Sequence, residues 1–189
     1  MKSLLHFCKF LLHRELPQTQ LTAREVELLL KYSCDVAIAV EIGCYEGSTT
    51  AALASNTKGA IFSIDPFFNG RAGVCYGEWI AKLHCQRRKL NNVHFIKGFS
   101  FEVVHKFHNE IDFLFIDADH SYEAIKRDWN DWFPKMRRHG IIALHDCKQA
   151  INSPHYLGSM RFYDEDIPEI TNIEQLDSVD SLVLFKALK

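Results

Sequence analysis

The stretch FLFIDADHSYEAI, residues 113–125, brings a polar cluster directly after an apolar run. Its first four residues are apolar and predict a buried strand. Asp117, Asp119 and His120 follow at once, and apolar residues then recur at three- and four-residue steps, as in an amphipathic helix. A buried strand that ends on acids and leads into a helix is typical of a parallel α/β sheet, in which ligands bind at the carboxyl ends of the strands.

The same alternation of short apolar runs and longer helical patterns extends over most of the chain. Strands are predicted at Val36–Ile42, Ala60–Ile64, Val93–Lys97, Ile111–Ile116, Gly140–Leu144, Ile170–Gln175 and Leu182–Lys186. Helices are predicted over residues 22–32, 47–56, 75–90, 100–108 and 121–138. This order predicts a doubly wound α/β fold. The last two strands are joined by a short turn, which predicts an antiparallel strand at the end of a mostly parallel seven-stranded sheet, near the C-terminus.

Length and composition indicate one domain. The chain has 189 residues, 47% of them hydrophobic, which is enough for a sizeable core. We expect a helical appendage over residues 1–33 and the α/β core over residues 34–189. The start, MKSLLHFCKFLL, predicts a helix that packs on this core, or against a second copy of the chain in a homodimer, rather than an export signal.

Charge, hydropathy and cysteine usage argue against several classes of partner. No apolar stretch reaches the roughly 20 residues that a membrane span needs, so no membrane partner is expected. Six cysteines without a CxxC pair predict reduced thiols in a cytoplasmic protein. A net charge of −2 argues against nucleic acid as a partner. The basic runs at residues 86–89 and 135–138 are interpreted as solvated helix ends rather than RNA contacts.

The segment EIGCYEGST, residues 41–49, predicts a glycine turn between a strand and a helix. Its spacing is neither the G-x-G-x-x-G dinucleotide fingerprint nor a P-loop. Glu41 would repel a pyrophosphate but suits a cationic or hydroxyl-bearing ligand; the alternative is an ordinary turn with a partly exposed glutamate. Asp65 ends the next strand, about 20 residues further on, where an acid suits a ribose diol or makes an Asx-turn before Pro66. Together the two segments favour an adenosine-containing ligand.

These segments and FIDADHSYEAIKRDWNDWFPKMRRHGIIALHDC, residues 115–147, resemble class I S-adenosylmethionine-dependent methyltransferases. The similarity covers about residues 36–189 and is greatest to the "methyltransferase 24" type of small-molecule O-methyltransferases. It implies a Rossmann-like fold, S-adenosylmethionine as the cofactor, and methyl transfer to a hydroxyl of a small acceptor. The implied cofactor-binding residues are Glu41, Gly43, Tyr45, Gly47, Ser48, Asp65, Phe99, Ser100 and Asp117.

The resemblance also implies a divalent cation such as Mg²⁺, held by Asp117 and Asp146 at the ends of the fourth and fifth strands. Cys147 departs from the pattern, because a carboxylate or amide often follows the second acid and a thiol is a poor ligand for a hard ion. Two readings therefore stay open. Two carboxylates with waters and substrate oxygens hold the ion, or the enzyme is a metal-independent methyltransferase acting on N, O or C.

Methyl transfer to a hydroxyl also requires removal of a proton, and Asp119 and His120 are the catalytic candidates. Asp119 has an alternative role as a cap of the helix that Ser121 opens. His145 is predicted to point away from Asp146 and to be structural. The N-terminal helices and residues 147–168 are expected to contact the acceptor. A catalytically silent module that only binds S-adenosylmethionine remains an alternative, whereas the glycine spacing disfavours an NAD-dependent dehydrogenase.

Overall fold

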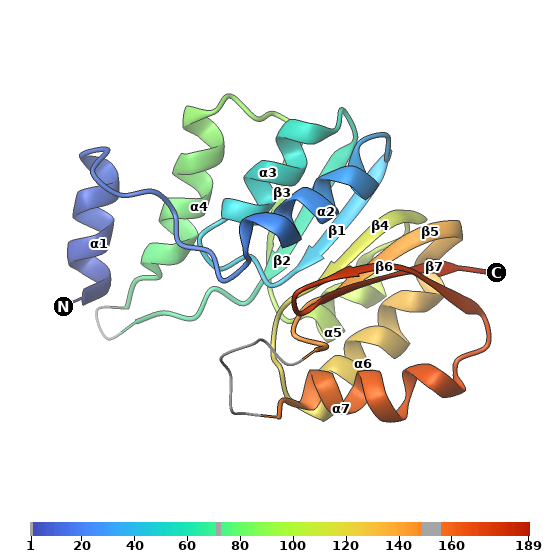
Figure 1. Ribbon diagram of the computed structural model, residues 1–189. Helices are drawn as coiled ribbons and strands as arrows, with labels where there is room; N and C mark the ends of the chain where they lie inside the picture. Colours follow the sequence, from blue (N-terminus) through green and yellow to red (C-terminus); the bar gives the residue numbers. More distant parts are fainter. Residues whose placement is uncertain (1, 71–72, 149–155) are drawn as a thin grey trace.

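The computed structural model describes residues 2–70, 73–148 and 156–189 (Figure 1). A seven-stranded sheet in the order β3-β2-β1-β4-β5-β7-β6 forms its centre. Its strands are β1 (Ile38–Ile42), β2 (Ala60–Asp65), β3 (Val93–Lys97), β4 (Ile111–Ile116), β5 (Met136–Leu144), β6 (Ile173–Val179) and β7 (Leu182–Ala187). The first five pair in parallel, and β7 is antiparallel to both β5 and β6. The predicted sheet is confirmed, but the edge strand is β6, with the antiparallel β7 inside it.

Helices cover both faces of the sheet, with α2, α3 and α4 on one face and α5, α6 and α7 on the other (Figure 1). The α-helices are α1 (Lys2–Leu11), α2 (Ala23–Ser33), α3 (Ser48–Asn56), α4 (Tyr76–Arg87), α5 (Ser100–Val103), α6 (Tyr122–Trp132) and α7 (Gly158–Glu165). Short 3₁₀ turns follow three of them at η1 (Val104–Lys106), η2 (Phe133–Lys135) and η3 (Ile167–Glu169).

The core has two halves because strand side chains alternate between the faces of the sheet. In β4, Phe113 and Phe115 pack toward α2 and α3, whereas Leu114 and Ile116 pack toward α6 and α7. All four are at most 1% exposed. The apolar run that opens the quoted stretch is therefore a strand buried on both sides, and its continuous hydrophobicity follows from that position.

The boundary between α6 and β5 differs from the prediction. The helical pattern was expected to continue to residue 138, but α6 ends at Trp132 and β5 begins at Met136. Pro134 lies in the 3₁₀ turn between them and lacks the N–H that a continuing α-helix needs. Met136 then pairs with Ile111, and the register shifts before Phe113, so β5 starts early and irregularly.

The N-terminal helices attach in different ways. Thr22 and Glu25 form a capping box at the start of α2, the helix predicted over residues 22–32. The helix α1 lies beyond α4 at one end of the molecule (Figure 1). Its Phe7 packs against Tyr76 and Trp79 of α4. Within the described part of the chain, no helix is long and apolar enough to cross a membrane. All six cysteines lie in described residues and are unpaired.

Candidate active site at the carboxyl ends of the strands

A cavity of about 920 Å³ opens at the carboxyl ends of β1, β2, β3 and β4. Its walls come from the turns after these strands, at residues 42–46, 64–68, 98–101 and 117–120. The N-terminal segment adds Ser3, His6 and residues 18–21. This volume is at the upper end of the range for small-molecule sites, which is about 300–1,000 Å³. The cavity thus lies where the sequence predicted ligand binding.

The glycine turn brings the ends of β1 and β4 into close contact. Gly43 has φ +96°, and a Cβ there would lie 2.0 Å from the carbonyl oxygen of Asp117, so only glycine fits. The carboxylate of Asp65 holds the other side of the turn, because one oxygen accepts the backbone N–H groups of Cys44 and Tyr45 at 2.9 and 3.1 Å. Its second oxygen accepts the N–H of Phe67 at 2.7 Å. Asp65 therefore combines the predicted Asx-turn with a position on the cavity wall.

Glu41 lies beneath the cavity rather than on its wall. It is fully buried and accepts hydrogen bonds from Thr50 and, at 2.7 Å, from Ser63. Burial raises the pKa of Glu41 to about 8, although these hydrogen bonds lower it. Gly47 also lies off the wall; its φ of +73° places it as the N-cap of α3. Both residues shape the turn from below, and neither is among the residues that line the cavity.

Tyr45 and Ser48 do line the cavity, as predicted. Tyr45 has φ +53° and is half exposed, and its hydroxyl donates to Gln18 Oε1 at 2.6 Å. Glu46 accepts the backbone N–H of Gln18 at 2.6 Å and lies 2.9 Å from His6 Nε2. These contacts fasten the N-terminal segment over the glycine turn.

A second end of the cavity lies after β3. Phe99 and Ser100 line it as predicted, together with Asp128 from α6. Ser100 Oγ donates to the carboxylate of Asp128, which is only 3% exposed. Burial raises the pKa of Asp128 to about 6, against the hydrogen bond from Ser100, which lowers it. Asp128 was not predicted as a site residue. In the sequence it could have been found as an acid on the otherwise apolar inner face of α6.

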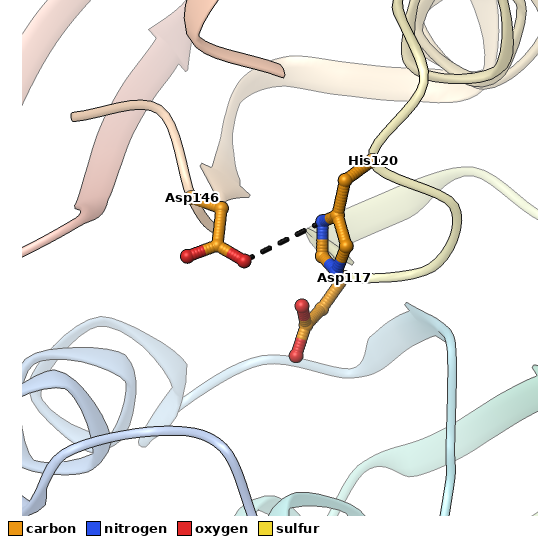
Figure 2. Close-up of side chains that lie close together, drawn as sticks. All are labelled: Asp117, His120 and Asp146. Atoms are coloured by element: carbon orange, nitrogen blue, oxygen red, sulfur yellow. Dashed lines mark ion pairs between the residues drawn. The ribbon is translucent and has the colours of Figure 1, made fainter. Parts of the chain in front are cut away.

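Asp117, His120 and Asp146 converge at the ends of β4 and β5 (Figure 2). One ligand atom from each lies within 4.8 Å of the others. His120 Nδ1 is 3.5 Å from Asp146 Oδ2, and both side chains are partly exposed. Asp117 and His120 line the cavity, whereas Asp146 is not among its lining residues. Two carboxylates and an imidazole are a donor set that divalent cations accept, and His120 adds a ligand candidate to the two predicted acids.

The start of α7 holds His120 and Asp146 together. Ser159 donates its backbone N–H to the carbonyl of His120 at 3.2 Å and its hydroxyl to the carbonyl of Asp146 at 2.7 Å. A Cβ at Gly158 would lie 2.0 Å from the backbone nitrogen of Tyr122, so the helix approaches this turn as closely as glycine allows. In the sequence this contact is marked only by the pair Gly158-Ser159, to which no role was assigned.

The prediction that His145 points away from Asp146 is wrong, because its side chain faces both Asp117 and Asp146. Its Nδ1 is 2.9 Å from Asp117 Oδ1 and 3.5 Å from Asp146 Oδ2, while Nε2 is 3.4 Å from Glu25 Oε2. Strand alternation failed here because Asp146 has φ +53° and leaves the extended conformation. Burial lowers the pKa of His145, but Asp117, Glu25 and Asp146 raise it to about 10.

Glu25 reaches this cluster from α2 and is 1% exposed. One oxygen accepts the backbone N–H and the hydroxyl of Ser181 at 3.0 and 2.7 Å, and the other accepts the N–H of Thr22 at 2.8 Å. Burial would raise the pKa of Glu25, but His145, Thr22 and Ser181 hold it at about 2. An ionised glutamate and a protonated histidine therefore lie side by side below the site.

Asp119 makes an Asx-turn ahead of α6 rather than capping the helix. Its Oδ1 accepts the backbone N–H of Ser121, the N-cap residue of α6, at 2.8 Å. Hydrogen bonds from Ser121 lower the pKa of Asp119, which makes it a weaker base. The side chain still lines the cavity, next to His120.

Of the two segments expected to contact the acceptor, the N-terminal one lines the cavity, and the described residues of 147–168 do not. Ser3, His6 and residues 18–21 of the N-terminal segment line the cavity. Residues 149–155 lie outside the described part of the chain. Among the described residues of 147–168, Tyr156 is exposed and donates to Asp164 at 2.8 Å, and none lines the cavity.

Fold and cavity together define a class I S-adenosylmethionine-dependent methyltransferase domain. Residues 40–147, more than half of the chain, match the family model described as a methyltransferase domain. The chain belongs to this family.

Sequence similarity extends to an uncharacterized protein, R132, of Acanthamoeba polyphaga mimivirus. The two are 28% identical over 138 residues, which is 68% of this chain and 59% of that protein. The chain thus spans 59% of the length of this curated relative.

Solved structures share the fold. Cofactor-bound Rv0187 from MTB superimposes with a TM-score of 0.74 at 17% identity, covering 100% of this chain and 91% of that one. The O-methyltransferase TomG from Streptomyces achromogenes, involved in tomaymycin synthesis and solved in complex with S-adenosylmethionine, gives 0.72 at 14% identity with the same coverage. At these identities the likeness concerns the fold.

Proposed function

We propose that this methyltransferase transfers a methyl group from S-adenosylmethionine to a hydroxyl of a small molecule, beside Asp117, His120 and Asp146. One observation carries the proposal: these three groups, each able to bind a cation or accept a proton, meet at the end of the cavity next to the glycine turn. A cavity of about 920 Å³ has room for a cofactor and a small acceptor.

The cofactor would extend from the glycine turn to the pocket after β3. When bound, S-adenosylmethionine supplies a methyl group on a positively charged sulfur. Asp65 retains lone pairs to accept from ribose hydroxyls beside its three backbone N–H partners. Phe99, Ser100 and Asp128 would hold the adenine end. Gly43 and Tyr45 would border the methionine end, since Gly43 packs against the backbone of Asp117 and Tyr45 lines the cavity in the same turn.

His120 would take the proton from the acceptor hydroxyl. Its Nδ1 faces Asp146 at 3.5 Å, so that carboxylate orients the ring and stabilises it once protonated. The other ring nitrogen, Nε2, is then the candidate proton acceptor. We assign Asp119 to positioning, because its Asx-turn with Ser121 holds the backbone that carries His120.

The donor set also fits a divalent cation. Asp117, Asp146 and His120 would hold it, and Cys147 would not, because its thiol is 2% exposed and burial raises its pKa far above the usual value. Such an ion would lower the pKa of a hydroxyl bound to it. Water molecules and oxygens of the acceptor would occupy the remaining coordination positions of the ion.

A metal-independent reaction is the second candidate, and His145 favours it. This buried imidazole lies between Asp117 and Asp146 and already offsets part of their negative charge. A cation at the same acids would be repelled by the protonated ring. In that case His120 alone would remove the proton.

The experiment is methyl transfer from labelled S-adenosylmethionine to a panel of catechols and other small hydroxylated acceptors. It is run with a chelator, and then with Mg²⁺ or Mn²⁺ restored. The proposal expects an O-methylated product that the His120→Ala variant forms at least a hundredfold more slowly. Full turnover in chelator would assign the metal-independent reaction. Cofactor binding without transfer to any acceptor class would count against O-methylation.

A further inference from the structure

The outer face of α1 carries a patch of leucines that the fold leaves uncovered. Leu4, Leu5, Leu11 and Leu12 are 47, 59, 39 and 65% exposed. Leu4, Leu5 and Leu11 share one face of the helix, with the exposed Cys8 between them. Leu12 follows in the turn after α1, seven residues from Leu5, and its backbone N–H still donates to the carbonyl of Cys8 at 3.1 Å. We call these four residues the leucine patch. Single exposed leucines are ordinary on protein surfaces, whereas a cluster on one face marks a contact surface.

The opposite face of α1 is fixed to the domain. Phe7 packs on Tyr76 and on Trp79, with ring centroids 5.2 and 5.6 Å apart, and Phe10 is 3% exposed. Arg87 of α4 donates to the carbonyl oxygens of Phe10 and Leu11, each at 3.1 Å. These contacts hold the helix with its leucines outward.

Positive charge borders the leucine patch. Arg14 is exposed just after α1, whereas Lys9 of α1 is paired with Glu15 at 2.5 Å, so Arg14 rather than Lys9 contributes positive charge here. The exposed basic run at residues 86–89 ends α4, and its Arg87 touches the end of α1. That run, interpreted from sequence only as a solvated helix end, therefore lies beside the apolar patch.

We propose that the leucine patch and its basic border dock on an anionic lipid surface, with α1 lying in the plane of the interface. A helix with an apolar face and basic flanks binds this way without spanning the bilayer, and each basic residue near the surface adds attraction. Trp79, half exposed beside Phe7, is a residue type that favours such interfaces.

A second copy of the chain fits this surface less well. In a two-fold dimer the same patch meets itself, so the basic borders of both copies would face each other and repel. An anionic lipid surface has the opposite charge. Ser3 and His6 of α1 line the cavity, so a docked molecule would hold its active site next to the lipid.

The test is co-sedimentation of the full chain with vesicles, either of phosphatidylcholine alone or of equal parts phosphatidylcholine and phosphatidylserine. We expect binding to the anionic vesicles that weakens with added salt. The Leu5→Ser/Leu12→Ser variant and the Arg88→Glu/Lys89→Glu variant should each lose roughly tenfold or more in vesicle affinity. S-adenosylmethionine binding by both variants should equal that of the wild type, which separates this proposal from the catalytic one.

Two matched variants serve as controls. Lys106→Glu/Arg138→Glu reverses two exposed charges elsewhere, and Leu188→Ser removes an exposed leucine elsewhere; both should bind vesicles like the wild type. Equal binding by all variants, or no binding by the wild type, would overturn the proposal. So would a concentration-dependent dimer that Leu5→Ser/Leu12→Ser converts to a monomer, because the patch would then serve self-association.

Discussion

His145 Nδ1 lies 2.9 Å from Asp117 Oδ1, below the floor of the cavity. The same ring contacts Glu25 and Asp146, so a single buried imidazole joins α2 to the ends of β4 and β5. Its raised pKa of about 10 keeps it protonated at neutral pH. A cation that belongs to the protein therefore lies against both Asp117 and Asp146.

His145→Ala removes the partner of three carboxylates, one of them, Glu25, almost fully buried. Leaving such a charge uncompensated costs about 3 kcal/mol in the free energy of unfolding. For a chain of this length the Tm falls by roughly 6–12 °C. Thermal denaturation followed by circular dichroism measures it, with the exposed His105→Ala as the control. An unchanged Tm would show that the ring does not stabilise the acids.

The raised pKa of Glu41 predicts that the free energy of unfolding depends on pH. Burial raises its pKa in the folded protein to about 8, above its unfolded value. Its contribution to stability is therefore fully present below about pH 4.5 and is lost as the pH rises through about 8. Glu41→Gln should remove this part of the pH dependence and gain stability relative to the wild type between these values.

Urea unfolding at a series of pH values measures the effect, and the exposed Glu27→Gln on α2 is the matched control. Parallel stability curves for Glu41→Gln and the wild type across this window would mean that Glu41 is ionised at an ordinary pKa.

Asp119 gives a test of turn formation against catalysis. Asparagine makes the same Asx-turn as aspartate, so Asp119→Asn should keep both the Tm and the rate of methyl transfer. Asp119→Ala removes the hydrogen bond to Ser121 and should lose about 1 kcal/mol of stability. A fall in rate of about a hundredfold in Asp119→Asn, with an unchanged Tm, would instead assign the carboxylate a role in proton transfer.

Asp128 is expected to contribute to cofactor affinity at the pocket after β3. Asp128→Asn removes the charge that accepts from Ser100 and should weaken S-adenosylhomocysteine binding by roughly tenfold. Asp131→Asn, on the same helix but off the cavity wall, should bind like the wild type. Calorimetric titration measures both. Equal affinity in the two variants would place Asp128 in a purely structural role.

The sheet was predictable because its strands are apolar on both faces and end on Gly, Asp or His, signals that local sequence carries. The end of α6 was not, because a local helical pattern hid the pairing of Met136 with Ile111, which involves a distant strand. In the site, the location of Asp117 was predictable from its place after β4. The orientation of His145 was not predictable, because the positive φ of Asp146 breaks strand alternation and appears only in three dimensions.

Glu25 and Asp128 illustrate the same limit. Glu25 belongs to a local capping box with Thr22, but its second role depends on His145, which lies far away in the sequence. Asp128 gains its role from Ser100 on a different helix. Sequence patterns predict which strand end carries an acid, whereas the partners of that acid come from packing between elements.

Calorimetric titration of S-adenosylmethionine into the full chain measures whether the crevice at the ends of β1, β2 and β4 binds this cofactor. We predict one cofactor per chain, with Asp65→Asn weakening binding by roughly tenfold or more. No heat of binding at millimolar cofactor, or equal binding by Asp65→Asn and the wild type, would contradict the account.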